Sequence, residues 1–244
     1  MKKEMIVFDK DGTLMDFDAF WVGVTVSVIQ DILQKIHCEE VEIETVMRAL
    51  GTENGVSDID GLLCSGTYEE AGLALYEIVK EQGCTFSDKE IVEMLISTYK
   101  EKAVDGIVRP TCNGLQNIIS GLKNNGYKLV VATADNPEMT EKCLADLGVR
   151  EYFDAVFTDD GITPAKPDPG CILEYCQSVG VSIDKVVMVG DTMTDVAFAR
   201  NAGMNLIGVC ATEKNRQRLA PYTDAVIREV SQVLEVMEKL GWTK

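Results

Sequence analysis

The chain has 244 residues, of which 46% are hydrophobic and 26% are charged, and its 23 Lys and Arg against 40 Asp and Glu give a net charge of −17. This composition excludes a disordered, collagen-like or fibrous chain, and the length suits one large domain or two modest ones. So acidic a chain repels phosphate backbones and anionic lipid, and we therefore expect no nucleic-acid partner and no membrane partner.

The N-terminus and the cysteines predict a cytoplasmic protein with reduced thiols. The apolar run 5–8 is too short for the core of a signal peptide, and no apolar run approaches the ~20 residues that cross a bilayer. The eight cysteines show neither Cys-x-x-Cys spacing nor clustering with the single histidine, His37. This pattern argues against a zinc site and favours free thiols over disulfides.

The first hundred residues predict one strand followed by a helical insert. Residues 4–9 form a short apolar run that stops at acidic residues, as is typical of a strand buried on both faces of a parallel sheet. In residues 16–106 apolar residues recur at helical spacing and no strand is expected. The helical stretches cover residues 17–38, 41–50, 68–82 and 89–103. Ser87 with Glu90 is a candidate N-cap pair for the last of them.

From residue 108 onward, short apolar runs alternate with helical stretches of about ten residues, which predicts βαβ units and a parallel sheet. The expected strands are 128–133, 155–158, 186–189, 205–209 and 223–227. The first expected helix has Asn113 as its N-cap and ends at Asn125. The other expected helices cover 137–147, 169–179, 193–202 and 230–240. The first strand must join this sheet. We therefore predict an α/β protein whose Rossmann-like core, residues 1–15 and 107–244, has helices on both faces and carries an inserted all-α domain at 16–106.

The strongest chemical signal is Asp9-Lys10-Asp11-Gly12-Thr13-Leu14, directly after the first strand. In open α/β sheets ligands bind at the carboxyl ends of strands, near the point where the strand order reverses. Residues i and i+2 of an extended segment share a side, so Asp9 and Asp11 are expected to face one pocket, with Gly12 letting the chain turn away. The competing interpretation is a solvated turn, since Asp and Gly are common after strands.

Three further segments that follow predicted strands carry polar groups. Thr133 ends one strand and is followed by Ala134, whose amide could bind a phosphate oxygen. Lys166 stands in a proline-rich loop, as a rigidly mounted cation or as an ordinary surface lysine. Asp191 follows a buried strand, and Asp195 comes one helical turn later. Each signal is weak alone, but their common position after strands indicates one site.

Taken in order, Asp9–Leu14, Thr133, Lys166 and Gly190–Asp195 resemble the four motifs of the haloacid dehalogenase superfamily. Within it the chain is similar to the phosphatases and phosphomutases that carry a helical cap after the first motif, of the phosphoglycolate phosphatase and β-phosphoglucomutase kind. The resemblance covers essentially the whole chain. It implies a Rossmann-like core with a cap, and it does not identify the substrate.

The resemblance implies a covalent mechanism at the first motif. Asp9 would be the nucleophile that becomes an aspartyl-phosphate, which divides one difficult displacement into two easier ones. Asp11 would protonate the leaving alcohol and then deprotonate the attacking water. Thr133 and the Ala134 amide would hold phosphoryl oxygens, and Lys166 would neutralise the charge shared by Asp9 and the phosphate.

A magnesium ion is also implied by the resemblance. The Asp9 carboxylate, the Asp11 backbone carbonyl and Asp191 would bind Mg²⁺, and Asp195 would orient Lys166 or a metal-bound water. Oxygen ligands at an open site suit this ion. A phosphate dianion approaching several carboxylates would be repelled without a metal and a lysine.

The sequence predicts a Mg²⁺-dependent phosphatase that hydrolyses a small phosphorylated metabolite. By the resemblance, Asp11 would supply the acid/base group that a hydrolase needs. A sugar phosphomutase is the alternative, which Gly190 weakens because some mutases of the superfamily carry an acid there. A non-catalytic phosphate-binding regulator is the other alternative, against which the complete motifs argue. Asp135 is left with two interpretations, a partner for a basic substrate group or an outward-pointing side chain, and both monomer and dimer stay open.

Overall fold

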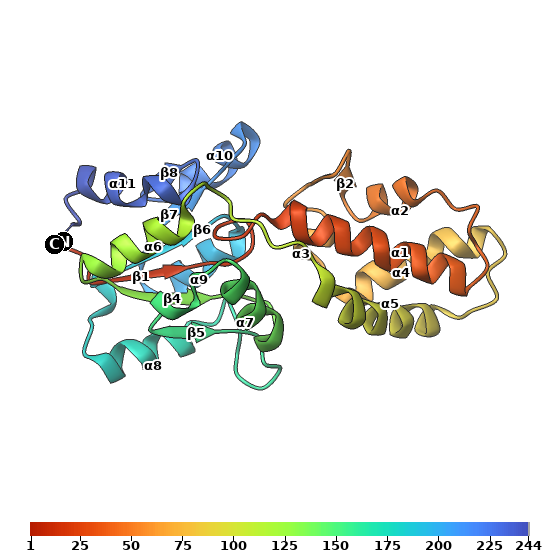
Figure 1. The fold of residues 1–244 in the computed structure, drawn as a ribbon, viewed down its shortest axis with the longest axis horizontal. Coiled ribbons are helices and arrows are strands. Elements are labelled where there is room, and N and C mark those ends of the chain that lie inside the picture. The colour runs from red at the N-terminus through yellow and green to blue at the C-terminus, as the bar shows by residue number, and fades with distance from the viewer. Residues whose placement is uncertain (244) are drawn as a thin grey trace. The chain divides into compact units, whose positions relative to one another are not determined.

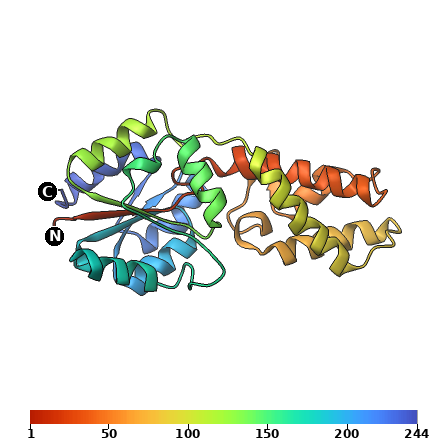
Figure 2. The ribbon, with the colours of Figure 1, turned by 60° about the horizontal axis from the view of Figure 1, so that its bottom comes forward.

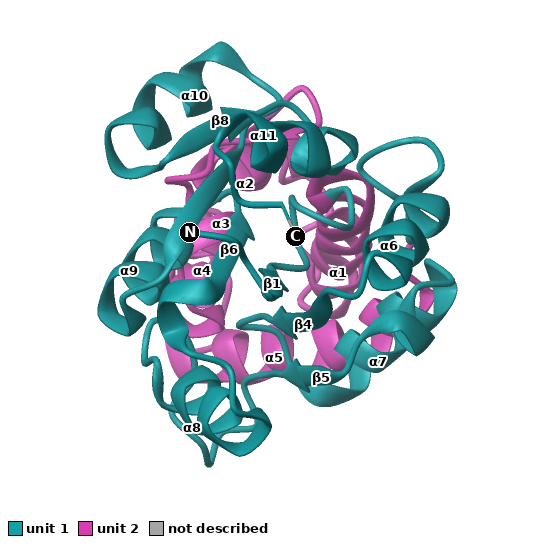
Figure 3. Ribbon diagram, turned by 90° about the vertical axis from the view of Figure 1, so that its left-hand side faces the viewer, with its two compact units in different colours: residues 1–16, 108–244 teal, residues 17–107 magenta. Residues whose placement is uncertain are grey.

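The structure, a computed structural model, describes residues 1–243. The chain forms two compact units (Figure 3). Unit 1 contains residues 1–16 and the chain from residue 108 on, and unit 2 contains residues 17–107. Because one segment is inserted between the first strand of unit 1 and the rest of it, the order of elements is that of an interrupted α/β domain.

Unit 1 is built on a parallel sheet, six-stranded within the described residues, in the order β5-β4-β1-β6-β7-β8 (Figure 1). Its strands are β1 (Met5–Phe8), β4 (Lys128–Ala132), β5 (Ala155–Phe157), β6 (Val186–Gly190), β7 (Asn205–Val209) and β8 (Ala225–Ile227). Every residue of β1 is buried, as its continuous apolarity predicts. The strand order reverses on the two sides of β1, which makes its carboxyl end the switch point of the sheet.

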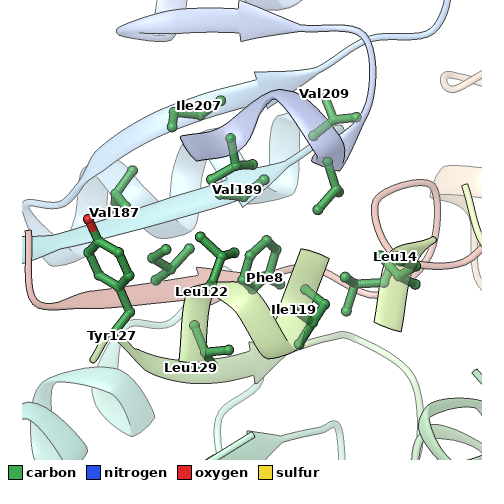
Figure 4. Close-up of a cluster of buried hydrophobic side chains, with 14 of the residues drawn as sticks. Phe8, Leu14, Ile119, Leu122, Tyr127, Leu129, Val187, Val189, Ile207 and Val209 are labelled. Carbon is green, nitrogen blue, oxygen red and sulfur yellow. The ribbon is translucent and has the colours of Figure 1, made fainter. Parts of the chain in front are cut away.

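Helices cover both faces of this sheet, and the α/β Rossmann-like fold is confirmed. On one face alternate strand residues, among them Phe8, Leu129 and Val189, pack against α6 (Leu115–Asn124), α7 (Pro137–Asp146) and α11 (Val233–Lys239) (Figure 4). The other face packs on α8 (Gly170–Val179), α9 (Met193–Ala202) and α10 (Glu213–Leu219). Figure 2 shows the yellow-green α6 and the teal α8 on opposite sides of the red β1.

Unit 1 differs from the sequence prediction in several details, two of which concern α6 and α10. The N-cap of α6 is Gly114 in the left-handed conformation, with φ +72°, rather than Asn113. Helix α10 was not expected, because six of its seven residues are polar and only Leu219 is buried. Its N-cap is nevertheless an ordinary signal, since the Thr212 hydroxyl accepts a hydrogen bond from the Asn215 N–H.

Unit 2 is mostly helical. Its elements are the π-helical turn η1 (Asp18–Val22), α1 (Gly23–Lys35), α2 (Ile43–Ala49), α3 (Leu62–Ser65), α4 (Tyr68–Glu81), α5 (Asp88–Lys102) and the 3-10 turn η2 (Ala103–Asp105). Helix α5 begins with the expected capping box, in which Ser87 and Glu90 each accept a hydrogen bond from the other's backbone N–H.

The expectation that residues 16–106 contain no strand is wrong in one place. The short strands β2 (Thr52–Glu53) and β3 (Val56–Ser57) pair as an antiparallel hairpin. The turn between them is Asn54-Gly55, with φ +52° and +77°. Asn-Gly is the strongest short-range hairpin signal, because both positions of this turn require positive φ. The signal was present in the sequence.

Residues 1–243 contain no helix that is both long enough and apolar enough to cross a membrane. The eight cysteines, all within the described chain, are free, so the expectation of thiols rather than disulfides is confirmed.

Candidate active site

Three neighbouring strands of unit 1 end in polar residues. Asp9 follows β1, Thr133 follows β4 and Asp191 follows β6. The backbone keeps the pairing of the sheet for one more residue, because the Asp9 N–H donates to the Val189 carbonyl at 2.9 Å and the Thr133 N–H donates to the Phe157 carbonyl at 2.9 Å. Parallel strands that end at the same edge therefore bring these side chains to the switch point.

The loop after β1 is a tight turn that depends on Gly12. Its φ is +77°, and its N–H donates to the Met15 carbonyl at 2.7 Å. A Cβ at this position would lie 2.1 Å from Asp191 Oδ2. Any side chain here would therefore be strained and would also displace Asp191.

Lys166 joins two buried carboxylates. Its Nζ lies 2.5 Å from Asp9 Oδ1 and 2.7 Å from Asp195 Oδ1. Burial raises the pKa of Asp9 to about 7, and Lys166 only partly opposes that rise, since Asp195 and Asp11 add to it. Burial lowers the pKa of Lys166, but Asp195 and Asp9 outweigh it and leave that pKa raised. Lys166 therefore stays a cation at neutral pH.

Asp195 is fixed by its place at the start of α9. Its Oδ2 accepts hydrogen bonds from the Asp191 N–H, the Thr192 N–H and Thr192 Oγ1, at 3.1, 3.0 and 2.7 Å. Thr192 and Asp195 form the capping box of the helix. A Cβ on Gly190 would lie 2.5 Å from Asp195 Cγ, so no acidic side chain can replace this glycine without moving Asp195.

Asp191 completes a cluster of three acids. Thr13 Oγ1 donates to Asp191 Oδ1 at 2.9 Å. Burial raises the pKa of Asp191 well above its usual range, and Asp9 and Asp195 raise it further. One carboxylate oxygen each from Asp9, Asp191 and Asp195 lies within 4.8 Å of the others. An oxygen-only donor set with excess negative charge fits a hard divalent cation such as Mg²⁺.

Asp11 and Asp135 lie on either side of Lys10, an arrangement that sequence reasoning missed. Lys10 Nζ is 2.7 Å from Asp11 Oδ2 and 3.0 Å from Asp135 Oδ2, and the Lys10 side chain is 0% exposed. Asp135 therefore has a partner inside the protein, which neither of its two earlier interpretations included. The only signal in the sequence was a lysine between two acids after a buried strand.

Thr133 and Ala134 lie in the loop that follows β4. Thr133 is buried, and its Oγ1 accepts a hydrogen bond from the Asp135 N–H at 3.2 Å. Ala134 is exposed. A cavity of about 130 Å³ in unit 1 is lined by Thr133 and Lys166, together with Thr163 and Cys171. The structure thus brings Asp9, Lys166, Asp191 and Asp195 into one cluster, beside Thr133 and Ala134 in the neighbouring loop.

Comparisons with known proteins give a family model that matches this chain, several relatives and structures of the same fold. Residues 3–203 match the family model described as haloacid dehalogenase-like hydrolase. The chain is 28% identical to a candidate pyrophosphatase PpaX of Clostridium perfringens, over 70% of this chain and 78% of that protein. It is 26% identical to a phosphoglycolate phosphatase of Psychrobacter arcticus, over 86% of this chain and 84% of that protein. The crystal structure of a candidate β-phosphoglucomutase from Thermotoga maritima shares the fold, with a TM-score of 0.69 and 20% identity. The match covers 97% of this chain and 99% of that protein.

Proposed function

The chain belongs to the haloacid dehalogenase-like hydrolase family, and from that premise we propose that it is a Mg²⁺-dependent phosphatase acting on a small phosphomonoester metabolite through an aspartyl-phosphate. The observation that carries the proposal is the Asp9 carboxylate, buried at the switch point of the sheet and paired with Lys166 at 2.5 Å. A buried carboxylate beside a fixed cation is suited to attack a phosphate dianion.

In the first step Asp9 attacks phosphorus. Lys166 contacts Oδ1, which leaves Oδ2 to form the new bond to phosphorus. As the bond to the leaving oxygen breaks, Asp11 gives that oxygen its proton. In the second step Asp11, now a carboxylate, takes a proton from water as the water oxygen attacks phosphorus. The bond to Asp9 breaks, and inorganic phosphate and free Asp9 are the products.

The phosphoryl oxygens would be held by groups at two strand ends. We assign this role to Thr133, to the exposed Ala134 N–H and to Lys166, which stays cationic between two acids. Hydrogen-bond donors fixed before the reaction stabilise charge that develops in the transition state.

Asp9, Asp191 and the Asp11 backbone carbonyl would hold Mg²⁺, which when bound neutralises charge on the phosphoryl group. The close approach of the Asp9, Asp191 and Asp195 carboxylates supports a cation at this place. The Asp195 oxygens already accept from Lys166, Thr192 and the Asp191 N–H, and we therefore assign Asp195 a supporting role.

The inserted unit 2 would be the cap that selects the leaving group, on a catalytic core made by unit 1. The free cysteines fit a reducing cytoplasm. A sugar phosphomutase is the alternative reaction. The lack of space for an acid at Gly190 favours hydrolysis over that alternative.

The test is release of inorganic phosphate from p-nitrophenyl phosphate, with millimolar Mg²⁺ and with EDTA. We expect turnover that requires Mg²⁺ and a phosphoryl group on Asp9 in acid-quenched enzyme. Turnover that EDTA does not reduce would contradict the metal dependence. A panel of 2-phosphoglycolate, pyrophosphate and sugar phosphates, each assayed for phosphate release and for isomerisation, separates phosphatase from mutase.

A further inference from the structure

Lys10 is a buried lysine that the proposed reaction does not use. It lies between the two acids of the first motif, and its ammonium group pairs with Asp11 and Asp135. Asp11 belongs to the loop after β1, whereas Asp135 belongs to the loop after β4. Lys10 Nζ therefore connects two loops that meet at the edge of the sheet.

The side chain is held at both ends. The Lys10 carbonyl accepts hydrogen bonds from the Leu14 N–H and the Met15 N–H, each at 2.9 Å, and this fixes the backbone. The ammonium group forms ion pairs with the two carboxylates. A long lysine side chain loses conformational freedom when it is fixed, so this arrangement is costly and packing alone would favour an apolar residue.

The charges around Lys10 make it a permanent cation. Burial lowers the pKa of Lys10, but Asp11 and Asp135 outweigh this effect and leave that pKa raised. Burial also raises the pKa of Asp135, which Lys10 partly opposes. The two acids thus favour the protonated form of Lys10.

The three side chains differ in exposure. Lys10 is 0% exposed and Asp135 9%, whereas the Asp11 side chain is 19% exposed. Asp135 and Lys10 form the less exposed part of the group, and Asp11 is its most exposed member. A proton-transferring carboxyl needs this access and also a fixed orientation toward the leaving oxygen.

We propose that Lys10, anchored by Asp135, is a positioning residue that fixes the Asp11 carboxyl for proton transfer to the leaving oxygen. This inference rests on the proposed function, specifically on Asp11 as the acid. In this role Lys10 would contact neither substrate nor the reacting phosphorus. It neither gains nor loses a proton, and its effect passes entirely through Asp11.

The proposal predicts a loss that depends on the leaving group. An alkoxide is a poor leaving group and needs the proton of Asp11, whereas p-nitrophenolate leaves with little help. Replacing Lys10 should therefore slow phosphoenzyme formation from an alkyl phosphate much more than from p-nitrophenyl phosphate. Loss of a purely structural lysine would slow both substrates by the same factor.

The experiment measures phosphoenzyme formation in single turnovers with glycerol phosphate and with p-nitrophenyl phosphate. The variants are Lys10→Met and the double variant Lys10→Met/Asp135→Asn, in which no unpaired buried charge is left. The control is Lys3→Met, which removes the buried lysine at the other end of β1. We expect both Lys10 variants to lose about tenfold or more on glycerol phosphate and less than about threefold on p-nitrophenyl phosphate, with KM nearly unchanged.

An equal loss on the two substrates would overturn the proposal, and so would full recovery of the glycerol phosphate rate in the double variant. Recovery would mean that Lys10 only balances the charge of Asp135. Failure of the proposed function gives a different result. Wild-type enzyme would then form no phosphoenzyme, or Asp11→Asn would lose the same factor on both substrates.

Discussion

The two units bury different kinds of polar side chain. In residues 17–107, all of which the structure describes, the buried polar residues are threonines, Thr25, Thr52 and Thr98. Unit 1 buries charged groups as well, namely Lys3, Asp9, Lys10 and Asp195. A threonine can satisfy its hydroxyl on a nearby backbone carbonyl, whereas a buried charge needs partners brought from distant segments. Buried charged residues therefore suggest a functional role rather than a contribution to stability. Among the described residues they lie in unit 1, which contains the candidate site.

Within unit 1, the two ends of β1 sharpen this contrast. Before β1, Lys3 Nζ donates to the Asp184 carbonyl and to Asn205 Oδ1 and lies 4.8 Å from the centre of the Trp242 ring. Burial lowers the pKa of Lys3 there, although Asp224 and Asp184 oppose it. After β1, Lys10 and Lys166 pair directly with carboxylates, and both of their pKa values are raised. One end of the strand satisfies its lysine mainly with neutral groups, and the other holds acids that are available for chemistry.

The largest expected effect comes from removing the buried carboxylate of Asp9. Asp9→Asn should lower kcat by about 10⁴-fold or more, because an amide cannot form the acyl-phosphate. The matched change in unit 2 is Thr25→Val, since Thr25 Oγ1 bonds the Trp21 carbonyl and Tyr99 Oη at 2.7 Å each. That variant should lose about 1–3 kcal/mol of stability and keep kcat within about threefold. Phosphate release and thermal melts measure both, and an active Asp9→Asn enzyme would refute the assignment.

Two glycines with the same φ, one in each unit, test the geometry of the site. Gly12 and Gly55 both have φ +77°, but an added Cβ at Gly55 meets nothing within 4 Å, whereas at Gly12 it would strike Asp191. Both alanine variants should lose about 1–2 kcal/mol through backbone strain. Gly12→Ala alone should lose about 10²-fold in kcat, because Asp191 must move. Equal activity of the two variants would show that the contact with Asp191 is unimportant.

The two buried lysines beside β1 should differ in what their loss costs. Lys10→Met leaves Asp135 buried and unpaired, so we expect about 3–5 kcal/mol of destabilisation. Lys3→Met leaves mainly neutral acceptors, and about 1–3 kcal/mol is expected. Denaturant titrations at one pH measure the difference. Adding Asp135→Asn should recover part of the loss in Lys10→Met and none of it in Lys3→Met. A Lys3→Met variant less stable than Lys10→Met would contradict this expectation.

Magnesium should stabilise the folded protein through Asp191. At ~100 times its dissociation constant, a ligand that binds only the folded state adds about 2.7 kcal/mol. Asp191→Ala removes one ligand and also one repelling carboxylate. It should therefore melt no lower than wild type in EDTA, yet gain little from millimolar Mg²⁺. A full Mg²⁺ shift in this variant would place the metal elsewhere.

Much of the fold was predictable because the strands of unit 1 are uninterrupted apolar runs. The boundaries of β7 and α9 coincide with those expected, since a capping Thr192 and a terminating Gly203 surround α9. The hairpin at Asn54-Gly55 has a recognisable sequence signal, the Asn-Gly turn. Helix α10 carried almost none, because a polar helix has no apolar periodicity.

The candidate site divides in the same way. The residues after strand ends could be chosen because parallel strands place their carboxyl ends together, and their roles stay predictions. The pairing of Lys10 with Asp135 could not be foreseen. It joins loops 125 residues apart, and only the adjacency of β1 and β4 brings them together. Sequence patterns predict which strands exist, but their order in the sheet decides which charges meet.

The last expected effect is a pH dependence of the stability of the metal-free enzyme, to which unit 2 should not contribute. Burial raises the pKa of Asp9 from 3.8 to about 7, so in EDTA the folded protein holds a proton that the unfolded chain has released. The stability contributed by that proton is present at low pH and is lost as the pH rises through about 7. The melting temperature of wild type in EDTA should therefore fall between pH 5 and pH 8, by about 2–4 °C for each kcal/mol lost. Asp9→Asn should show a shallower fall, and Thr25→Val the same fall as wild type. A wild-type melting temperature that stays constant over this range would mean that Asp9 is already ionised without a metal.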